Sequence, residues 1–357
     1  MSVPTSRAID LTGVYTMISG LPVLHRDPDS VQIGSEPPHC LVLHHAPPEA
    51  ASILRRLNGT APVGAVLRDH DADPVPWREV LSQLLDAHLL VPAHQWRFSG
   101  VTAGAFLEPE RDSLVHPFGI PAARRALQAR QDAIVVVRGT GRVATAVATS
   151  LAAAGVGHVH QQPDRALRLA DLADLAAGTA TTGPRDGRIG SPTAGDTAIL
   201  AANLRRSAPG VRVNAPAPHH RLTLVVLAGD GPPSPSLAAE LTASRLPHLA
   251  VTAGLTTAAV GPFVLPGRSS CLACVLRRRS EIDHFRGTLE EELRHEIRVP
   301  AIQLAAAAAS IAAADALSHI DGTTKPATLD GTIEWMLGDL APRRRSWEVH
   351  PDCGCSA

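Results

Sequence analysis

The sequence has very little lysine and few aromatic residues. Lys325 is the only lysine among the 33 lysine and arginine residues, and aromatic residues make up 3% of the chain. Single-stranded nucleic acids are commonly held by stacking their bases on aromatic rings, so the sequence offers a poor platform for that kind of binding. Any reaction that needs a lysine has one candidate residue.

An excess of charge and a long apolar run are also absent. The 357 residues carry a net charge of −1, so no overall field attracts nucleic acid or an acidic membrane. No run of about 18 apolar residues occurs that could cross a membrane, and the opening MSVPTSRAID does not resemble a signal peptide. We therefore expect a folded cytoplasmic protein of two or three domains, with no membrane or nucleic-acid partner.

Positive charge gathers locally in two arginine triplets. They occupy Arg277–Arg279 and Arg343–Arg345, and we interpret each as the solvated face of a helix or hairpin. A zinc-containing nucleic-acid binder that uses both triplets is the alternative that this pattern leaves open.

Residues 1–95 are expected to form a small α/β domain. Short extended patterns come first, and helical spacing of apolar residues follows. The extended patterns are Leu21–Arg26, Val31–Gly34 and Cys40–His44, and the clearest helical patterns are Ala50–Leu57, which stops at Asn58-Gly59, and Pro76–Leu90. Three strands and three short helices predict a winged-helix-like module. The proline-containing residues 96–130 are interpreted as a connector.

Residues 131–357 are expected to form a doubly wound, Rossmann-like α/β domain. The continuous apolar run Ala133–Val137 is typical of a strand buried on both faces of a parallel sheet. A glycine turn, a helical pattern and a second strand pattern follow it, which is the order of a βαβ unit. Further predictions are helices at Val143–Ala154, Thr197–Ser207, Leu237–Arg245 and Ala301–His319, strands at Val156–Gln161, Leu222–Leu227 and His248–Thr252, a hairpin of Ile333–Met336 with Ser346–Val349, and an irregular crossover at Ala177–Gly195.

The glycine turn is interpreted as a vestigial nucleotide loop. Gly139, Gly141 and Ala144 form the pattern G-x-G-x-x-A, and such a loop at the start of a helix can hold phosphates. The second strand, however, ends at His160–Pro163 without the acidic residue that usually holds a ribose, and no lysine precedes Lys325 in this domain. We therefore expect no bound ATP and no catalysis. The alternative is an active adenylating enzyme that acts on the C-terminus of a peptide or carrier protein.

Two cysteine pairs have the spacing of metal ligands. Cys271 and Cys274 form a C-x-x-C pair, and Cys353 and Cys355 form a C-x-C pair near the end of the chain. Four thiolates can hold zinc in a closed tetrahedron, so we predict a structural Zn²⁺ site. A redox C-x-x-C, two disulfides, or a site in which His350 replaces one cysteine are the alternatives.

The remaining reactive residues show no catalytic arrangement. The neighbours His44-His45 and His219-His220 have no cysteine or carboxylate at ligand spacing, so we interpret them as surface or core histidines. Cys40 is interpreted as an ordinary half-buried thiol. No G-x-S-x-G nucleophile motif occurs. We therefore expect a protein that is not an enzyme.

Several motifs together resemble one protein family. Val260–Arg268 running into Cys271–Cys274, the closing His350–Cys355, and the opening segments Gly20–Leu24 and Val31–Gly34 carry the resemblance. They are similar to the ThiF-like (ocin-ThiF-like) partner proteins of azole-forming and thiopeptide biosynthesis. The resemblance covers nearly the whole chain. It implies an N-terminal peptide-clamp domain, which is a precursor recognition element, followed by a ThiF/ubiquitin-activating-type domain with four zinc ligands.

The resemblance also implies a function. Members of this family bind the leader of a ribosomally made precursor peptide and deliver its core to a separate YcaO-type cyclodehydratase, which uses ATP to convert Cys, Ser or Thr residues into azolines. This branch is generally non-catalytic. The sequence does not decide whether the chain forms a homodimer, or whether the product is a linear azole peptide or a thiopeptide.

In this family the leader adds as a strand along the third strand and lies against the third helix. Carried onto this chain, the groove lies between Cys40–His44 and the helix that follows Pro76. The peptide-binding residues that the resemblance implies are Val42, His44, Leu81, Leu84, Leu85 and His88. The alternative is that Leu81, Leu84 and Leu85 are simply core residues.

Overall fold

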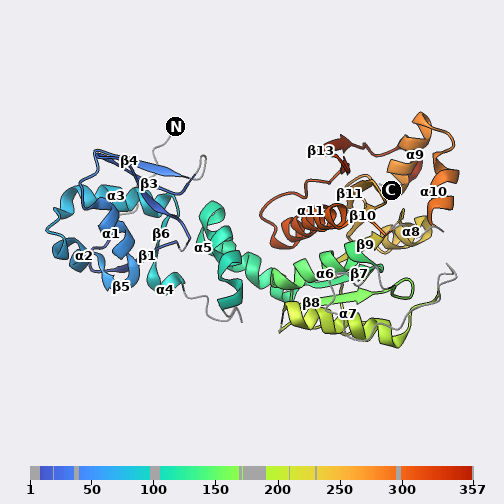
Figure 1. Cartoon of the computed structure of the whole chain (residues 1–357), viewed down its shortest axis with the longest axis horizontal. Coiled ribbons are helices and arrows are strands. Elements are labelled where there is room, and N and C mark those ends of the chain that lie inside the picture. Colours follow the sequence, from blue (N-terminus) through green and yellow to red (C-terminus); the bar gives the residue numbers. More distant parts are fainter. Residues whose placement is uncertain are drawn as a thin grey trace. The chain divides into compact units, whose positions relative to one another are not determined.

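The computed structural model divides the chain into two compact units, Met1–Leu127 and Gln128–Ala357. It describes residues 9–18, 20–35, 40–96, 105–168, 171, 190–208, 210–229, 231–294 and 299–355. Figure 1 labels the helices and strands of both units. Among the described residues, no helix is both long enough and apolar enough to cross a membrane.

The first unit contains two three-stranded antiparallel sheets. One has the order β2-β3-β4 and the other β5-β1-β6. The strands are β1 (Val14–Met17), β2 (Val23–Asp27), β3 (Ser30–Ile33), β4 (Leu41–His44), β5 (Asn58–Pro62) and β6 (Leu90–Pro92). The three predicted strands are confirmed as β2, β3 and β4, but the prediction missed the second sheet. Asn58-Gly59 looked like a helix end, whereas Asn58 begins strand β5.

Helices cover the sheets and close one apolar core. They are α1 (Ala50–Arg56), α2 (Val63–Asp69), α3 (Pro74–Asp86) and the single turn α4 (Ala93–Trp96). Helix α3 begins at Asp73, whose carboxylate accepts the backbone N–H of Val75. The expected helix Pro76–Leu90 ends at Asp86, because Leu90 already belongs to β6. Buried side chains from β3, β4 and the helices form the core, among them Ile33, Leu43, Ile53, Leu54, Trp77, Leu81 and Leu84.

The residues interpreted as a connector contain a long helix. A short 3₁₀ turn, η1 (Ala105–Leu107), leads into α5 (Glu108–Asp132), which is kinked at Gly119, where φ is +75°. Residues 97–104 lie outside the described part of the chain. Leu114, Val115 and Ile120 of α5 are buried together with Ile18, which follows β1, and Val91 of β6. The first part of α5 is therefore a structural part of the first unit.

The second unit is built on a seven-stranded mixed sheet with the order β13-β12-β11-β10-β9-β7-β8. Strands β7 to β10 run parallel to one another, and β11, β12 and β13 are antiparallel to their neighbours. The strands are β7 (Ile134–Arg138), β8 (His158–Gln162), β9 (Leu224–Gly229), β10 (His248–Ala253), β11 (Thr257–Val264), β12 (Gly331–Met336) and β13 (Asp339–Ser346). The parallel half confirms the predicted βαβ opening.

Helices pack on both faces of this sheet. They are α6 (Arg142–Ala153), α7 (Ala194–Ser207), α8 (Pro235–Ala243), α9 (Leu272–Ile282), α10 (Arg286–Arg294) and α11 (Ile302–Asp321). Ala305, Ala308 and Ala312 of α11 are buried in the same cluster as α6, since small side chains let two helices approach closely. On the other face Leu237 and Leu241 of α8 pack with Leu272 of α9. The expected crossover at Ala177–Gly195 falls mostly outside the described residues, and α7 begins at Ala194.

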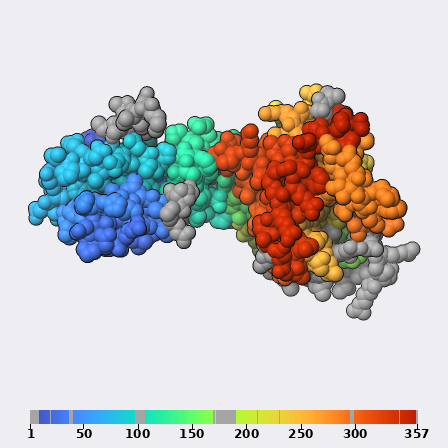
Figure 2. All heavy atoms as spheres, turned by 90° about the horizontal axis from the view of Figure 1, so that it is seen from above, coloured from blue at the N-terminus to red at the C-terminus, as the bar shows by residue number. Residues whose placement is uncertain are grey.

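The C-terminal hairpin differs from the prediction. β13 spans Asp339–Ser346, so the expected second strand at Ser346–Val349 was wrong in all but its first residue. β13 is an edge strand, and its residues Ala341–Ser346 are exposed, with Pro342 and three arginines among them. Figure 2 shows this C-terminal part of the chain, in red, at the surface of the second unit. Charged residues and proline are typical of exposed sheet edges, and they hid the strand from a hydrophobic pattern.

We predict that the fold loses stability in mild acid because of His248. Its side chain is fully buried, its Nδ1 lies 2.9 Å from the carbonyl oxygen of Leu246, and its Nε2 has no partner within the described chain. Burial lowers the pKa of His248 below its ordinary value. The unfolded chain therefore binds a proton first as the pH falls, and the stabilisation present above pH ~6.5 is lost below it.

The measurement is the free energy of unfolding from urea titrations between pH 8 and pH 5. A His248→Asn variant keeps a donor for Leu246 but cannot titrate, so its stability should fall less with acid. Equal pH dependence in the two proteins would contradict the assignment. Burial also lowers the pKa of His319. His319 would therefore account for the pH dependence of stability that remains in the variant.

Candidate functional site

The four predicted cysteine ligands form one cluster. Cys271 and Cys274 lie at the start of α9, and Cys353 and Cys355 lie in and just after the short 3₁₀ helix η3 (Pro351–Cys353). The Sγ atom of Cys271 is 3.7 Å from that of Cys274 and 3.4 Å from that of Cys353, and the Sγ atoms of Cys274 and Cys355 are 3.4 Å apart. All four sulfur atoms lie within 4.8 Å of one another.

This arrangement fits a tetrahedral metal ion. Four thiolates at the Zn–S distance of about 2.3 Å would be separated by about 3.8 Å, close to the spacing observed. A covalent disulfide would need about 2.05 Å. His350 is not a member of the cluster, because its Nε2 faces Glu281 Oε1 at 3.0 Å and its Nδ1 accepts the N–H of Asp352. The four cysteines together could therefore hold a metal ion.

The surroundings of the cluster shift the pKa values of its cysteines in different directions. Burial, and next the hydrogen bond with Cys271, raise the pKa of Cys353 to about 11, and burial raises that of Cys355 further. Burial acts in the same sense on Cys274, but N–H groups of His350 and Cys271 outweigh it and lower the pKa of Cys274. The protein thus stabilises the thiolate of Cys274, whereas Cys353 and Cys355 need a cation to become thiolates near neutral pH.

The glycine loop joins β7 to α6 as predicted, and it packs closely against β9. A Cβ on Gly139 would overlap the carbonyl oxygen of Ala228 in β9. The Thr140 hydroxyl, 2% exposed, donates to the carbonyl of Arg165 at 3.1 Å and accepts the N–H of Asp164 at 3.1 Å. Gly139 is therefore needed for packing against β9, with or without a nucleotide.

The end of β8 lacks the acidic side chain that would hold a ribose. Gln161 is buried there, and its amide donates to the carbonyl of Gly139 and to the Thr145 hydroxyl, both at 3.3 Å. Ala144, the third position of the motif, is fully buried against the sheet. Lys325 lies in an exposed loop after α11. These residues do not supply the compact cation or the ribose acceptor that a nucleotide of this kind usually meets.

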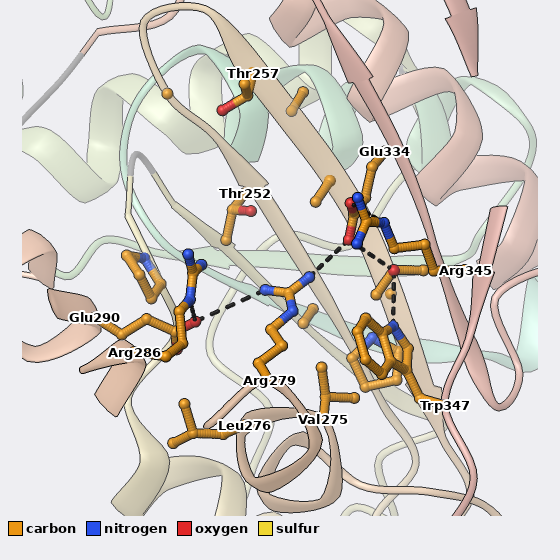
Figure 3. A pocket seen from close by; sticks show the side chains of 18 of the residues that line it. Thr252, Thr257, Val275, Leu276, Arg279, Arg286, Glu290, Glu334, Arg345 and Trp347 are labelled. Carbon is orange, nitrogen blue, oxygen red and sulfur yellow. Dashed lines mark hydrogen bonds and ion pairs between the residues drawn. The ribbon is translucent and has the colours of Figure 1, made fainter. Parts of the chain in front are cut away.

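A pocket of about 530 Å³ lies on the α9 side of the sheet (Figure 3). Strands β10 and β11 form its floor with small side chains, including Thr252, Thr257 and Ala259. Helices α9 and α10 form one wall, and β12, β13 and Trp347 form the other. This volume lies in the range of typical ligand sites.

Charged side chains alternate across this pocket. Arg286 Nε is 2.7 Å from Glu290, and Glu290 is 3.7 Å from Arg279. Arg279 is 2.7 Å from Glu334, whose other oxygen is 3.0 Å from Arg345 (Figure 3). We call these five side chains the charge ladder. It ties the two helices of one wall to the strands of the other.

The sequence interpretation missed the ladder because it treated the arginine triplets as uniform. Within Arg277–Arg279, Arg277 is exposed and Arg278 pairs with Glu281 on the same helix, whereas Arg279 is 24% exposed and reaches β12. Helical geometry separates the directions of consecutive side chains by about 100°. The signal that could have found Arg279 is its position one helical turn after Val275, which is buried.

The six residues predicted to line the peptide groove differ in burial. Leu81 and Leu84 are fully buried and belong to the core of the first unit, whereas Leu85 is half-buried. Side chains of a strand alternate, and Leu41 and Leu43 of β4 pack on that core. Val42, which is half-buried, and His44, which is exposed, therefore point to the other face of the sheet.

His88, the last predicted groove residue, is exposed and has a φ of +57°. Its ring lies close to Gly119 at the kink of α5. A cavity of about 880 Å³ in this unit is lined by residues of β1, α1 and α4, among them Met17, Leu57 and Trp96. None of the six predicted residues lines that cavity.

Comparison with known proteins identifies the fold. No protein-family model matches the chain, and no curated protein is detectably similar in sequence. E. coli MccB solved with AMPCPP and MccA is 14% identical, with 96% of this chain and 99% of that chain covered and a TM-score of 0.68. E. coli MccB solved with ATP has the same identity and coverage and a TM-score of 0.66.

A second protein shows the same similarity. PaaA is 16% identical, with 92% of this chain and 99% of that chain covered and a TM-score of 0.64. At these identities the likeness concerns the fold alone. The chain has an MccB-like fold.

Proposed function

We propose that the chain is a non-catalytic scaffold that binds the leader of a ribosomally made precursor peptide. It presents that peptide to a separate YcaO-type cyclodehydratase, which forms azolines with ATP. The observation that supports peptide binding most directly is the fold match over 96% of the chain, because the matched MccB structures include complexes with MccA, the precursor peptide. The proposed partner follows from the family resemblance of the motifs around the cysteines.

The first unit offers a strand edge for the leader. β4 is an edge strand of its sheet within the described residues, and Leu43 of β4 shares a buried cluster with Leu81 and Leu84 of α3. A peptide added along β4 would gain main-chain hydrogen bonds and would run beside α3. Its side chains would then meet the half-buried Leu85, while Leu81 and Leu84 support that surface from below.

The residues around the glycine loop support the non-catalytic part of the proposal. Thr140 and Gln161 are already engaged with the loop and its neighbours, and the strand end carries glutamine where an acidic residue is usual. The second unit keeps the architecture of a nucleotide-binding domain because that architecture forms its core.

An ATP-using adenylating enzyme is the second candidate. It is favoured by one observation, which is that MccB of the same fold has been solved with ATP and with AMPCPP. With this function, the C-terminal carboxylate of a peptide or carrier protein would accept the adenylyl group of ATP.

We also propose that the metal in the cysteine cluster is zinc and that its role is structural. Four thiolates fill a tetrahedral site and leave no open position for water, which suits architecture and not catalysis. Zinc would join the start of α9 to a segment 82 residues later in the chain.

The leader site is tested by replacing Leu85. We predict that Leu85→Gln weakens binding of the leader of the cognate precursor peptide by about tenfold, the size of effect typical when an apolar contact residue is lost from an interface. Binding is measured by fluorescence anisotropy with a labelled leader. Val75→Gln on the same helix is the control, because Val75 is 72% exposed. An equal loss of leader affinity in both variants, or no loss in either, would show that the leader binds elsewhere.

The two candidate functions are separated by direct nucleotide binding. We expect no heat of binding when Mg²⁺ and ATP are titrated into the chain by calorimetry, with E. coli MccB as the positive control. Binding at micromolar concentration would favour the adenylating enzyme. Loss of activity in a Gly139→Ala variant would not decide the question, because that side chain would clash with Ala228 whether or not ATP binds.

Loss of the metal should destabilise the second unit. We predict one zinc ion per chain by mass spectrometry of metals, and none in a Cys353→Ser, Cys355→Ser variant. The thermal midpoint of that variant should fall by roughly 10 °C or more, since several kcal/mol of binding free energy contribute to folding and each shifts the midpoint by about 2–4 °C. Cys40→Ser, in the other unit, should keep both the zinc and the midpoint. An unchanged midpoint in the double variant would contradict a structural role.

A further inference from the structure

The four cysteines of the metal cluster differ in exposure. Cys271 and Cys274, at the start of α9, are 4% and 0% exposed. Cys353 and Cys355, in the C-terminal segment, are half-buried. A small reagent in the solvent therefore meets the C-terminal cysteines first, and the buried cysteines of α9 lie behind them.

The sulfur atoms of the two segments already lie close together in pairs. The Sγ atoms of Cys271 and Cys353 are 3.4 Å apart, and so are those of Cys274 and Cys355. The separation within α9, between Cys271 and Cys274, is longer at 3.7 Å. A disulfide has an S–S length of about 2.05 Å, so side-chain rotation and a small approach of the two segments would close either pair.

Pairing within each segment is the alternative, and the C-terminal segment opposes it. If Cys271 paired with Cys274, the other two cysteines would have only each other. Cys353 and Cys355 are separated by the single residue Gly354. A disulfide prefers a Cβ–S–S–Cβ dihedral of about 90°, and a ring this small reaches that angle only under strain. The geometry therefore favours the two bonds between the segments.

We infer that the cysteine cluster is a site of oxidative modification, at which a peroxide converts the four thiolates into the disulfides Cys271–Cys353 and Cys274–Cys355. The inference takes from the proposed function only that the cluster holds zinc, and it goes beyond the structural role of that metal. The junction between α9 and the C-terminal segment is kept, with covalent bonds in place of metal bonds.

The reaction has two steps at each pair of sulfurs. Metal binding keeps the cysteines as thiolates, which is their nucleophilic form. The thiolate of the half-buried cysteine attacks hydrogen peroxide, the O–O bond breaks, hydroxide leaves and a sulfenic acid forms. The buried thiolate then attacks the sulfur of the sulfenic acid, the S–S bond forms and a second hydroxide leaves.

The electrons and atoms of this reaction balance. Each pair of sulfurs loses two electrons to one molecule of peroxide, and two protons from the solvent convert the two hydroxides into water. The whole cluster consumes two molecules of peroxide. Zn²⁺ keeps its oxidation state and is released, because its four ligands are no longer thiolates.

The connectivity has a consequence for stability. Cys271 and Cys353 are 82 residues apart, and Cys274 and Cys355 are 81 residues apart. A disulfide that closes a long loop restricts the unfolded chain and so stabilises the folded one. The second unit should therefore stay folded when oxidation releases its metal, although it should lose stability when a chelator removes the metal from reduced thiols.

Digestion with trypsin makes the connectivity measurable. Trypsin cleaves after arginine, so the two cysteines of α9 fall in the peptide of residues 269–277 and the two C-terminal cysteines in the peptide of residues 346–357. The full chain, with Cys40→Ser to prevent cross-links between molecules, is treated with hydrogen peroxide and digested without reduction. Mass spectrometry should find the two peptides linked by two disulfides, and the bound zinc should be lost. Dithiothreitol should separate the peptides.

Two double variants distinguish the two ways of linking the segments. Cys271→Ser with Cys353→Ser keeps the pair of Cys274 and Cys355, whose sulfurs are 3.4 Å apart. Cys271→Ser with Cys355→Ser keeps Cys274 and Cys353 instead and is the matched control, because it also lacks one cysteine of each segment. The first variant should form its disulfide about tenfold faster, since its two sulfurs are already close.

Thermal unfolding tests the consequence for stability. The oxidised chain should unfold within about 5 °C of the zinc-bound chain, because the cross-links replace the metal. The chain stripped of zinc by a chelator in dithiothreitol should unfold roughly 10 °C or more below it. Both samples have the same sequence, so the difference reports only the state of the four sulfurs.

Four results would overturn the inference. They are two separate peptides with internal disulfides, sulfinic or sulfonic acids in place of disulfides, equal rates in the two double variants, and an oxidised chain as unstable as the stripped one. Retention of zinc after complete oxidation would do the same. A purified chain without zinc would defeat the zinc proposal alone, because the digest and the rates can be measured on the reduced, metal-free chain.

Discussion

The cross-link that four cysteines can form through a metal ion is the constraint on which the pocket of the second unit depends. Cys271 and Cys274 fix the start of α9, and Cys353 and Cys355 fix the segment that follows Trp347. Both walls of the pocket continue directly from these anchored segments. A metal ion held by the four cysteines would position the start of α9 more firmly than a few apolar contacts, and Arg279 lies one to two turns further along the same helix.

The first glycine of the loop is required by the packing of the sheet, whether or not the loop holds a nucleotide. Gly139 lies against the carbonyl of Ala228 so closely that no side chain fits, and this contact joins β7 to β9 in the centre of the sheet. Selection for the fold alone would keep that glycine. Thr140 and Gln161, which are bonded to their neighbours around the loop, are more informative about nucleotide binding than the glycines are.

The charged residues of the chain are distributed unevenly, so the net charge alone does not describe them. A net charge of −1 excludes a strong overall field, yet the ladder concentrates three arginines and two glutamates across one pocket. Ion pairs of this kind contribute little stability at an exposed surface, and more where side chains are partly buried and share partners. Here they hold α9 and α10 against β12 and β13 across the pocket.

Short-range information in the sequence determined much of this structure. The apolar run and glycine turn after Ala133 predicted a βαβ unit, and the two cysteine pairs predicted a single four-sulfur cluster, because chelating spacing is a local property that survives in any fold able to bring the pairs together. The tertiary structure alone decided the rest. The helical pattern of Leu81 and Leu84 is compatible with a groove or with a core, and both side chains are buried in the core. Strand β5 begins where Asn58-Gly59 looked like a helix end. Arg279 meets Glu334, 55 residues away, only because β12 pairs with β11 beside α9. Periodicity states which side of an element is apolar, but the order of strands in a sheet decides which charged residues on distant elements face one another.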